Sequence, residues 1–215
     1  MKYQAVLFDM DGTVLDTLDD LTDAVNASFR HFGYPPVETS TVRAFLGNGA
    51  AYLIRHCLPP NVSEEQMKPV LIWYKDYYDM HCRIKTAPYP GIPELMKMLF
   101  SRHIKLAIIS NKPDPTVQEL AVQFFPGLTD VVVGESAAVR RKPNPDSVLT
   151  AAGTMGTPID QCVYVGDSEV DIQTAMNAGM DCISVTLGFR SGEELKEAGA
   201  SVLADSPEAL GLLLC

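Results

Sequence analysis

Two carboxylates near the start of the chain are suited to phosphate chemistry. Asp9 and Asp11 stand two residues apart directly after the apolar run 5–8, so both side chains of an extended segment can point into one site. One carboxylate can attack phosphorus as a nucleophile, while the other protonates the leaving oxygen and later takes a proton from water. Gly12 allows the sharp turn that brings backbone N–H groups to a phosphate. Taken alone, the pattern also fits a capped turn after a strand.

Further acidic residues follow a later apolar run and offer hard oxygen ligands. Asp167 and Asp171 lie four residues apart in the segment Gly166–Asp171. Asp9, a backbone carbonyl near Asp11 and Asp167 would leave an octahedral Mg2+ with positions for water and a substrate oxygen. The alternative is that Gly-Asp-Ser is an ordinary turn that begins a helix.

Three other residues could bind a phosphate directly. Ser110 can donate its hydroxyl and Asn111 an amide N–H to a phosphate oxygen, and Lys142 adds a fixed positive charge. That charge would stabilise the equatorial oxygens in the transition state and keep neighbouring carboxylates ionised. A basic triplet such as 140–142 is otherwise typical of solvated surface.

The elements that must position these residues alternate along the chain. Short, continuously apolar runs indicate strands that are covered on both faces, as in parallel sheets, and helical patterns follow Gly91, Pro115 and Pro145. We therefore expect an open α/β sheet with right-handed crossovers, whose reactive groups meet at the carboxyl ends of the strands. The predicted strands are 5–8, 105–109, 131–133, 162–165 and 182–185.

An insertion interrupts this alternation, because roughly seventy residues separate the first two strands where a crossover needs far fewer. Leu18, Leu21, Val25, Phe29 and Phe32 form one apolar helical stripe. Further helical patterns cover 42–46, 50–58 and 64–80. The sequence thus predicts a helical domain over 15–87, inserted into a core formed by 1–14 and 88–215.

Composition limits the partners and the compartment. The 215 residues are 47% hydrophobic and 20% charged, as in soluble globular proteins. A net charge of -10 argues against nucleic acid, and it means that an anionic substrate needs a local cation. The early apolar run is too short for a membrane span or a signal peptide, and five cysteines without C-x-x-C spacing indicate reduced thiols. We expect a cytoplasmic monomer or weak homodimer that binds no membrane.

The order and spacing of the four segments resemble the haloacid dehalogenase-like hydrolase superfamily. Its motifs correspond to 9–13, 110–111, 142–143 and 166–171, and the resemblance covers nearly the whole chain. It implies an open parallel Rossmann-like α/β sheet with helices on both faces and an inserted all-helical cap. The roles it implies are nucleophile for Asp9, general acid/base for Asp11, phosphate binding for Ser110 and Lys142, Mg2+ binding for Asp9, Asp11 and Asp167, and orientation of the metal ligands for Asp171.

Within the superfamily, the chain is most similar to phosphoglycolate phosphatases. The segment 42–50 in the cap looks like the substrate loop of that branch, and 89–91 looks like its re-entry turn. Gly47, Asn48 and Gly49 would let backbone N–H groups close over the non-reacting end of a substrate, and Arg43 could pair with a carboxylate. A plain turn between two helices explains the same glycines.

The resemblance leaves rival functions open. A hexose-phosphate mutase of this fold would carry a histidine early in the first cap helix, where this chain has Leu21 and its neighbours. An inorganic pyrophosphatase with the same type of cap stays an alternative. A catalytically silent binding or regulatory protein is the alternative outside enzymes; loss of Asp9, Asp11, Lys142 or Asp167 would favour it, and all four are present.

Overall fold

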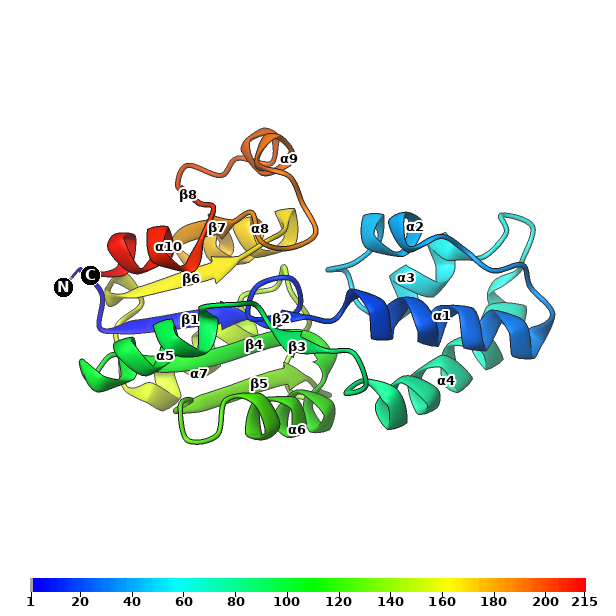
Figure 1. The fold of residues 1–215 in the computed structure, drawn as a ribbon, viewed down its shortest axis with the longest axis horizontal. Coiled ribbons are helices and arrows are strands. Elements are labelled where there is room, and N and C mark those ends of the chain that lie inside the picture. The colour runs from blue at the N-terminus through cyan, green and yellow to red at the C-terminus, as the bar shows by residue number, and fades with distance from the viewer. Residues whose placement is uncertain (1) are drawn as a thin grey trace. The chain divides into compact units, whose positions relative to one another are not determined.

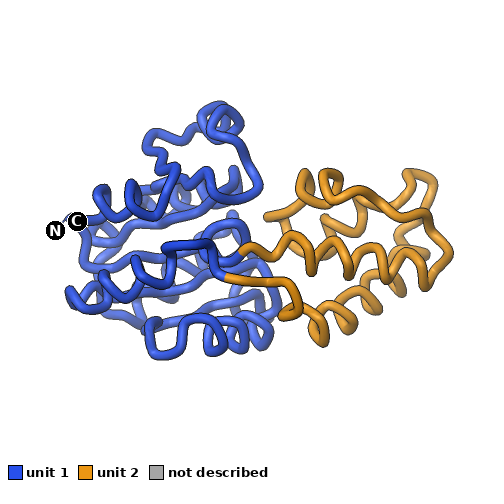
Figure 2. The backbone as a smooth tube through the Cα atoms, viewed as in Figure 1, with its two compact units in different colours: residues 1–15, 88–215 blue, residues 16–87 orange. Residues whose placement is uncertain are grey.

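The computed structural model describes residues 2–215, which form two compact units (Figure 2). The first unit combines the N-terminal segment up to Leu15 with Pro88–Cys215, and the second is Asp16–Ala87. Where the chain passes between the units, the short strands β2 (Leu15–Asp16) and β3 (Ala87–Pro88) pair with each other. The inserted segment therefore leaves and rejoins the first unit at neighbouring points.

The first unit is built on a six-stranded sheet with the strand order β5-β4-β1-β6-β7-β8 (Figure 1). Every neighbouring pair in it is parallel, which confirms the predicted open α/β sheet. All five residues of the central strand β1 are buried, and β8 was not predicted because two residues carry no periodicity. The strands are β1 (Ala5–Asp9), β4 (Lys105–Pro113), β5 (Val131–Glu135), β6 (Cys162–Gly166), β7 (Asp181–Val185) and β8 (Leu203–Ala204).

Helices cover both faces of this sheet. Alternate residues of β1 and β4, such as Leu7 and Ile109, pack into one apolar cluster with Val148 and Met155 of α7 and Ala175 of α8. Figure 1 shows α5, α6 and α10 on the near side of the sheet and α7 behind it. The helices are α5 (Ile92–Ser101), α6 (Asp114–Phe124), α7 (Asp146–Met155), α8 (Glu169–Ala178), α9 (Gly192–Glu197) and α10 (Pro207–Leu214), with a 3-10 turn at Ile159–Gln161.

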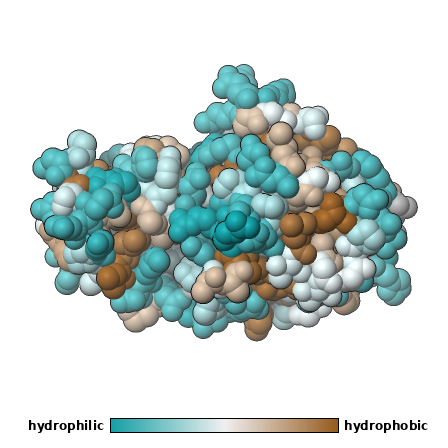
Figure 3. Space-filling view, turned by 180° about the vertical axis from the view of Figure 1, so that it is seen from behind, coloured by the Kyte–Doolittle hydropathy of each residue, from teal (hydrophilic) through white to brown (hydrophobic). Residues whose placement is uncertain are grey.

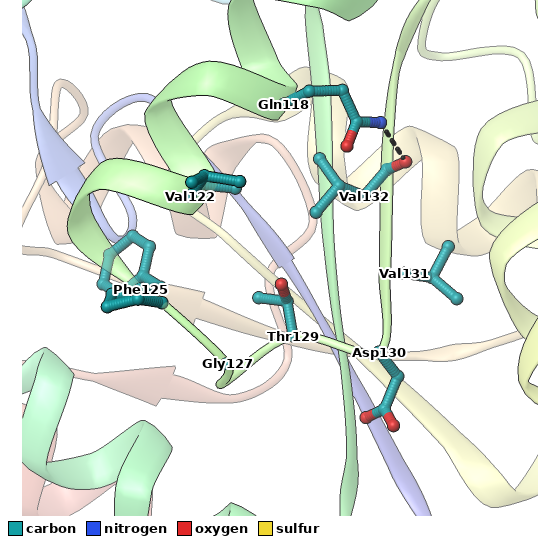
Figure 4. Close-up of a pocket in the computed structure, with 10 residues that line it drawn as sticks. Gln118, Val122, Phe125, Gly127, Thr129, Asp130, Val131 and Val132 are labelled. Carbon is teal, nitrogen blue, oxygen red and sulfur yellow. Dashed lines mark hydrogen bonds between the residues drawn. The ribbon is translucent and has the colours of Figure 1, made fainter.

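The edge strand β5 is bonded by side chains of α6. Gln118 Nε2 donates to Val132 O at 2.9 Å (Figure 4), and Gly134 N donates to Asp114 Oδ1 at 2.8 Å. A hollow of about 340 Å³ lies beside this edge, between the end of α6 and the start of β5. None of the predicted site residues lines that hollow, so it lies apart from the chemistry considered below.

The second unit is a bundle of four helices. α1 packs against α2 and α4, and α3 packs against both α2 and α4. Leu21, Val25 and Phe29 of the predicted stripe are buried, whereas Leu18 and Phe32 are only half-buried. The bounds are α1 (Leu18–Phe32), α2 (Thr39–Ala44), α3 (Ala50–Cys57) and α4 (Glu64–His81), close to the predicted helices.

The surface is mostly polar. On the face shown in Figure 3, hydrophilic residues predominate and hydrophobic ones form separate patches. Isolated exposed hydrophobic side chains, such as Ile72 and Met80 of α4, are normal on soluble proteins. Among residues 2–215, no helix has the length and apolar character needed to span a membrane.

A buried carboxylate at the start of α1 binds the backbone of the segment that follows α4. Asp20 in the first turn of α1 accepts hydrogen bonds from the backbone N–H groups of Ile84 at 3.1 Å, Lys85 at 3.0 Å and Thr86 at 2.8 Å. Asp20 is 3% exposed. Because a buried N–H without a partner costs free energy, this carboxylate fixes the segment that follows α4 to the start of α1.

We predict that Asp20→Ala lowers the free energy of unfolding by about 2–3 kcal/mol, since it removes the acceptor of the buried Thr86 N–H and of two partly buried N–H groups. Asp19→Ala is the matched control, because Asp19 is exposed and carries the same charge on the same turn. The control should stay within about 0.5 kcal/mol of the parent protein. Urea titrations followed by circular dichroism measure both, and equal losses would contradict the role of Asp20.

Candidate active site

The predicted site residues lie at the carboxyl ends of three adjacent strands. Asp9 ends β1, Ser110 lies near the end of β4, and Asp167 directly follows β6. The strand order places β4 and β6 on either side of β1. In open α/β sheets, a ligand binds at such a point, where the connections turn toward opposite sides.

Lys142 reaches this point from the loop between β5 and α7. Its Nζ donates to Asp9 Oδ1 at 2.6 Å, to Asp171 Oδ1 at 2.7 Å and to Tyr164 OH at 3.0 Å. An ammonium group has three N–H donors, so these partners use all of them. Lys142 is therefore held against the predicted nucleophile, and contact with a phosphate would require it to exchange a partner.

Burial and mutual repulsion determine the electrostatics here. Burial, with repulsion from Asp171, raises the pKa of Asp9 to about 7, although the charge of Lys142 opposes that rise. Burial and the same neighbouring carboxylates raise the pKa of Asp167 well above its usual range. Burial works against the charge of Lys142, but attraction by Asp171 and Asp9 outweighs it and raises the pKa of Lys142. Lys142 therefore stays protonated. Its single positive charge does not balance the neighbouring carboxyl groups when all of them are ionised.

Asn111 holds the backbone of Lys142 in place. Lys142 N donates to Asn111 Oδ1 at 2.7 Å, and Asn111 Nδ2 donates to Lys142 O at 3.1 Å. The side chain of Asn111 thus supports Lys142. Donation of an amide N–H from Asn111 to phosphate stays a prediction, because one bond to Lys142 O uses only one of the two N–H groups of the side-chain amide.

The carboxylates that gather here fit a divalent cation. Asp9, Asp167 and Asp171 each offer an oxygen within 4.8 Å of the others. Three carboxylates face one ammonium group, and an all-oxygen set of donors is the type that Mg2+ prefers. Both oxygens of Asp171 are already engaged, Oδ1 by Lys142 and Oδ2 by the N–H and hydroxyl of Ser168 at 3.1 and 2.6 Å. Asp167 likewise accepts a hydrogen bond on each oxygen, so the choice of Asp9 and Asp167 as ligands, with Asp171 beside them, stays a prediction.

The carboxylate of Asp11 lies outside that cluster and has other partners. Ser110 Oγ donates to Asp11 Oδ2 at 3.5 Å, and Lys112 forms an ion pair with Asp11 Oδ1. The pairing of β4 with β5 shifts register between Ile109 and Pro113, and such irregularities often redirect side chains beside active sites. Ser110 and Lys112, two residues apart on the strand, reach the same carboxylate. Sequence reasoning placed Lys112 at this strand end but gave it no role.

A second contribution that the sequence did not reveal comes from the loop after β7. Phe189 N donates to Asp167 Oδ2 at 2.7 Å, and Thr13 Oγ1 donates to Asp167 Oδ1 at 3.4 Å. Gly188 lies so close that an added Cβ would overlap both Gly12 O and the Asp167 carboxylate. The loop is anchored by the Arg190–Glu169 ion pair, with Nε–Oε2 at 3.0 Å and Nη2–Oε1 at 3.2 Å. It thus orients a predicted metal ligand.

The other predicted substrate-binding residues belong to the second unit. Arg43 is exposed near the end of α2, and Gly47, Asn48 and Gly49 lie between α2 and α3. The φ angles of Gly47 and Gly49 are 104° and 82°, which favour glycine over other residues. The turn therefore needs these glycines for its own backbone, and their contact with a substrate stays a prediction.

We predict that Gly188→Ala weakens Mg2+ binding, because the added methyl group must displace the loop that donates to Asp167. Gly192→Ala is the matched control, since a Cβ there would meet only Thr186 Cγ2 at 3.5 Å, an ordinary contact. The measurement is the rise in melting temperature on adding Mg2+, which should shrink for Gly188→Ala and match the parent for Gly192→Ala. An unchanged Mg2+ response in Gly188→Ala would contradict this role of the loop.

Comparison of the sequence with known proteins identifies the family of this chain. The haloacid dehalogenase-like hydrolase family matches residues 6–185. A phosphoglycolate phosphatase from Pseudomonas syringae pv. tomato is 30% identical over 93% of this chain and 75% of its own length. An N-acetylmuramic acid 6-phosphate phosphatase from Pseudomonas aeruginosa is 30% identical over 98% of this chain and 94% of its own.

A solved structure agrees over the whole length. The crystal structure of a candidate phosphoglycolate phosphatase from Lactobacillus delbrueckii subsp. bulgaricus superposes with a TM-score of 0.95 at 41% identity, covering 100% of this chain and 99% of that one. The family match spans most of the chain and includes the segments that carry Asp9, Ser110, Lys142 and Asp167. The chain therefore belongs to the haloacid dehalogenase-like hydrolase family.

Proposed function

We propose that this protein is a Mg2+-dependent phosphatase that hydrolyses a small phosphorylated metabolite through an aspartyl phosphate. The observation that carries the proposal is the separation of two aspartates at one strand end. Asp9 is bound by Lys142 in the buried cluster, whereas Asp11 is bound by Ser110 and Lys112 outside it. Two carboxylates in different surroundings can take different roles.

Each residue has a defined task in the proposed reaction. An oxygen of Asp9 attacks phosphorus, and the bond from phosphorus to the ester oxygen breaks. Asp11 gives its proton to that leaving oxygen and then takes a proton from the water that attacks the aspartyl phosphate. Inorganic phosphate leaves and Asp9 is regenerated. Burial raises the pKa of Asp9, and the adjacent positive charge of Lys142 opposes that rise and so favours the ionised nucleophile.

The metal would be held by Asp9, Asp167 and the backbone carbonyl of Asp11, with Asp171 orienting its surroundings. When bound, Mg2+ supplies positive charge against the phosphate oxygens. The loop at Gly188–Phe189 supports the proposal, because it holds Asp167 by a backbone hydrogen bond at 2.7 Å. Such support fixes a ligand in one orientation.

The substrate class we propose is a phosphorylated carboxylic acid of the phosphoglycolate type. Both curated relatives described above are named for phosphorylated acids. The net charge of -10 repels a substrate whose leaving group is also negatively charged. Cationic side chains are therefore needed to bind that group. We propose that Arg43 and the turn at 47–49 take part in this selection.

We predict that the purified protein hydrolyses an aryl phosphate with Mg2+, and that excess EDTA stops and Mg2+ restores turnover. Asp9→Asn should be inactive, because an amide is a poor nucleophile. Asp11→Asn should lose ~10²–10⁴-fold in rate with the loss of general acid/base catalysis. Quenching during turnover and reduction with borohydride would convert phosphorylated Asp9 to homoserine, which peptide mass spectrometry detects.

Three results would contradict this assignment. They are full activity in excess EDTA, a homoserine at Asp11, and normal turnover by Asp9→Asn. Asp16→Asn is a matched control, because Asp16 is exposed and lies outside the buried cluster. It should retain the parent rate.

A separate prediction concerns the second unit. Arg43→Ala and Gly47→Val should each lower kcat/KM for phosphoglycolate far more than for an aryl phosphate, since an aryl group offers no carboxylate to this segment. Arg30→Ala is the control, because Arg30 is an exposed arginine of the same unit at the far end of α1. Equal losses on both esters would show that the segment 43–49 does not select the substrate.

A further inference from the structure

A second lysine, Lys112, lies at the predicted acid/base and has no role in the reaction described so far. Its side chain is 10% exposed and its Nζ pairs with Asp11 Oδ1. Lysine is almost never this buried unless it is paired, since burial removes its ammonium group from water. The backbone also holds it in place, because Lys112 N donates to Ser110 Oγ at 3.1 Å and Ser110 Oγ contacts the same carboxylate.

The two lysines of the site serve different aspartates. Lys142 contacts Asp9, Asp171 and Tyr164, and its side chain is 3% exposed. It therefore serves Asp9, the proposed nucleophile. Lys112 contacts Asp11, whose side chain is 17% exposed. The cationic group of Lys112 therefore lies on the more accessible, leaving-group side of the reaction.

The chemistry of the leaving group defines what Lys112 would meet. To protonate the ester oxygen, Asp11 must come within about 2.6–3.2 Å of it. In an α-phosphorylated acid, a single carbon separates that ester oxygen from the carboxylate. An ammonium group bound to Asp11 is thus close to the carboxylate of such a substrate, and it has more than one N–H with which to donate.

We propose that Lys112 is a specificity residue that binds a carboxylate on the carbon carrying the phosphate ester. This inference rests on the proposed phosphatase function and adds to it the position of the acidic group. It adds a contact to that group from β4 in the first unit, beside the general acid, to the contact proposed for Arg43. A substrate with its carboxylate remote from the phosphate would gain nothing from Lys112.

The test compares two esters that differ only in this charge, 2-phosphoglycolate and its primary amide, 2-phosphoglycolamide. The parent protein should prefer the acid, and Lys112→Met should lower that preference, measured as the ratio of the kcat/KM values, about ten- to a hundredfold. A loss common to both esters reports on the support that Lys112 gives to Asp11. Only the change in ratio reports on the carboxylate.

Two controls make the ratio decisive. Lys97→Met removes the same charge from an exposed position on α5 and should leave the ratio unchanged. Lys112→Gln, with its fold checked by circular dichroism, provides a second variant in case the apolar methionine disturbs folding, and it should also lower the ratio.

The possible failures can be told apart. An unchanged ratio in both Lys112 variants, or an equal fall in Lys97→Met, overturns the inference. Equal use of acid and amide by the parent protein also overturns it while leaving the phosphatase proposal standing. Hydrolysis of neither ester, nor of an aryl phosphate with Mg2+, overturns the proposed function itself.

Discussion

Three carboxylates share one buried space with the ammonium group of Lys142, and the site depends on that group being held in place. Removing one partner of a buried ion pair strongly destabilises the folded protein, because the other charge stays buried without compensation. Lys142 bonds Asp9 and Asp171 at 2.6 and 2.7 Å, and Asn111 fixes its backbone from the neighbouring strand. The carboxylate of Asp9, the loop that carries Lys142 and the hydroxyl of Tyr164 are therefore energetically linked.

The same arrangement sets the charge balance that the acidic ligand proposed above would meet. Over the whole molecule the net charge is -10, and at long range an anion is repelled. Close to the site, Lys142 and Lys112 each face one of the two aspartates. Both ammonium groups are already paired with carboxylates, so attraction of an anion to the strand ends would also draw on the positive charge of the proposed Mg2+.

Sequence reasoning found the parts of the site that a strand end determines. Asp9, Ser110 and Asp167 follow apolar runs, and parallel strands bring such positions together. It missed Tyr164 and Phe189, because a tyrosine in an apolar run looks like core and a backbone N–H has no residue type to reveal it. It did not identify the bonds from the Asn111 side chain to the backbone of Lys142, since spacing shows where a residue lies along a strand but not which partner its amide finds. The contact of Lys112 with Asp11 was not identified either, because spacing places Lys112 at the strand end but does not show which group its ammonium meets.

The hydrogen bonds between α6 and the edge strand β5 affect the tendency of the protein to aggregate. An exposed strand at the side of a sheet is a template for strands from other chains, and this pairing is a route to aggregation. In β5, the acceptor Val132 O and the donor Gly134 N are already taken by Gln118 and Asp114. A strand from another molecule would first have to break these hydrogen bonds. Helix α6 therefore protects the β5 edge of the sheet against edge-to-edge association.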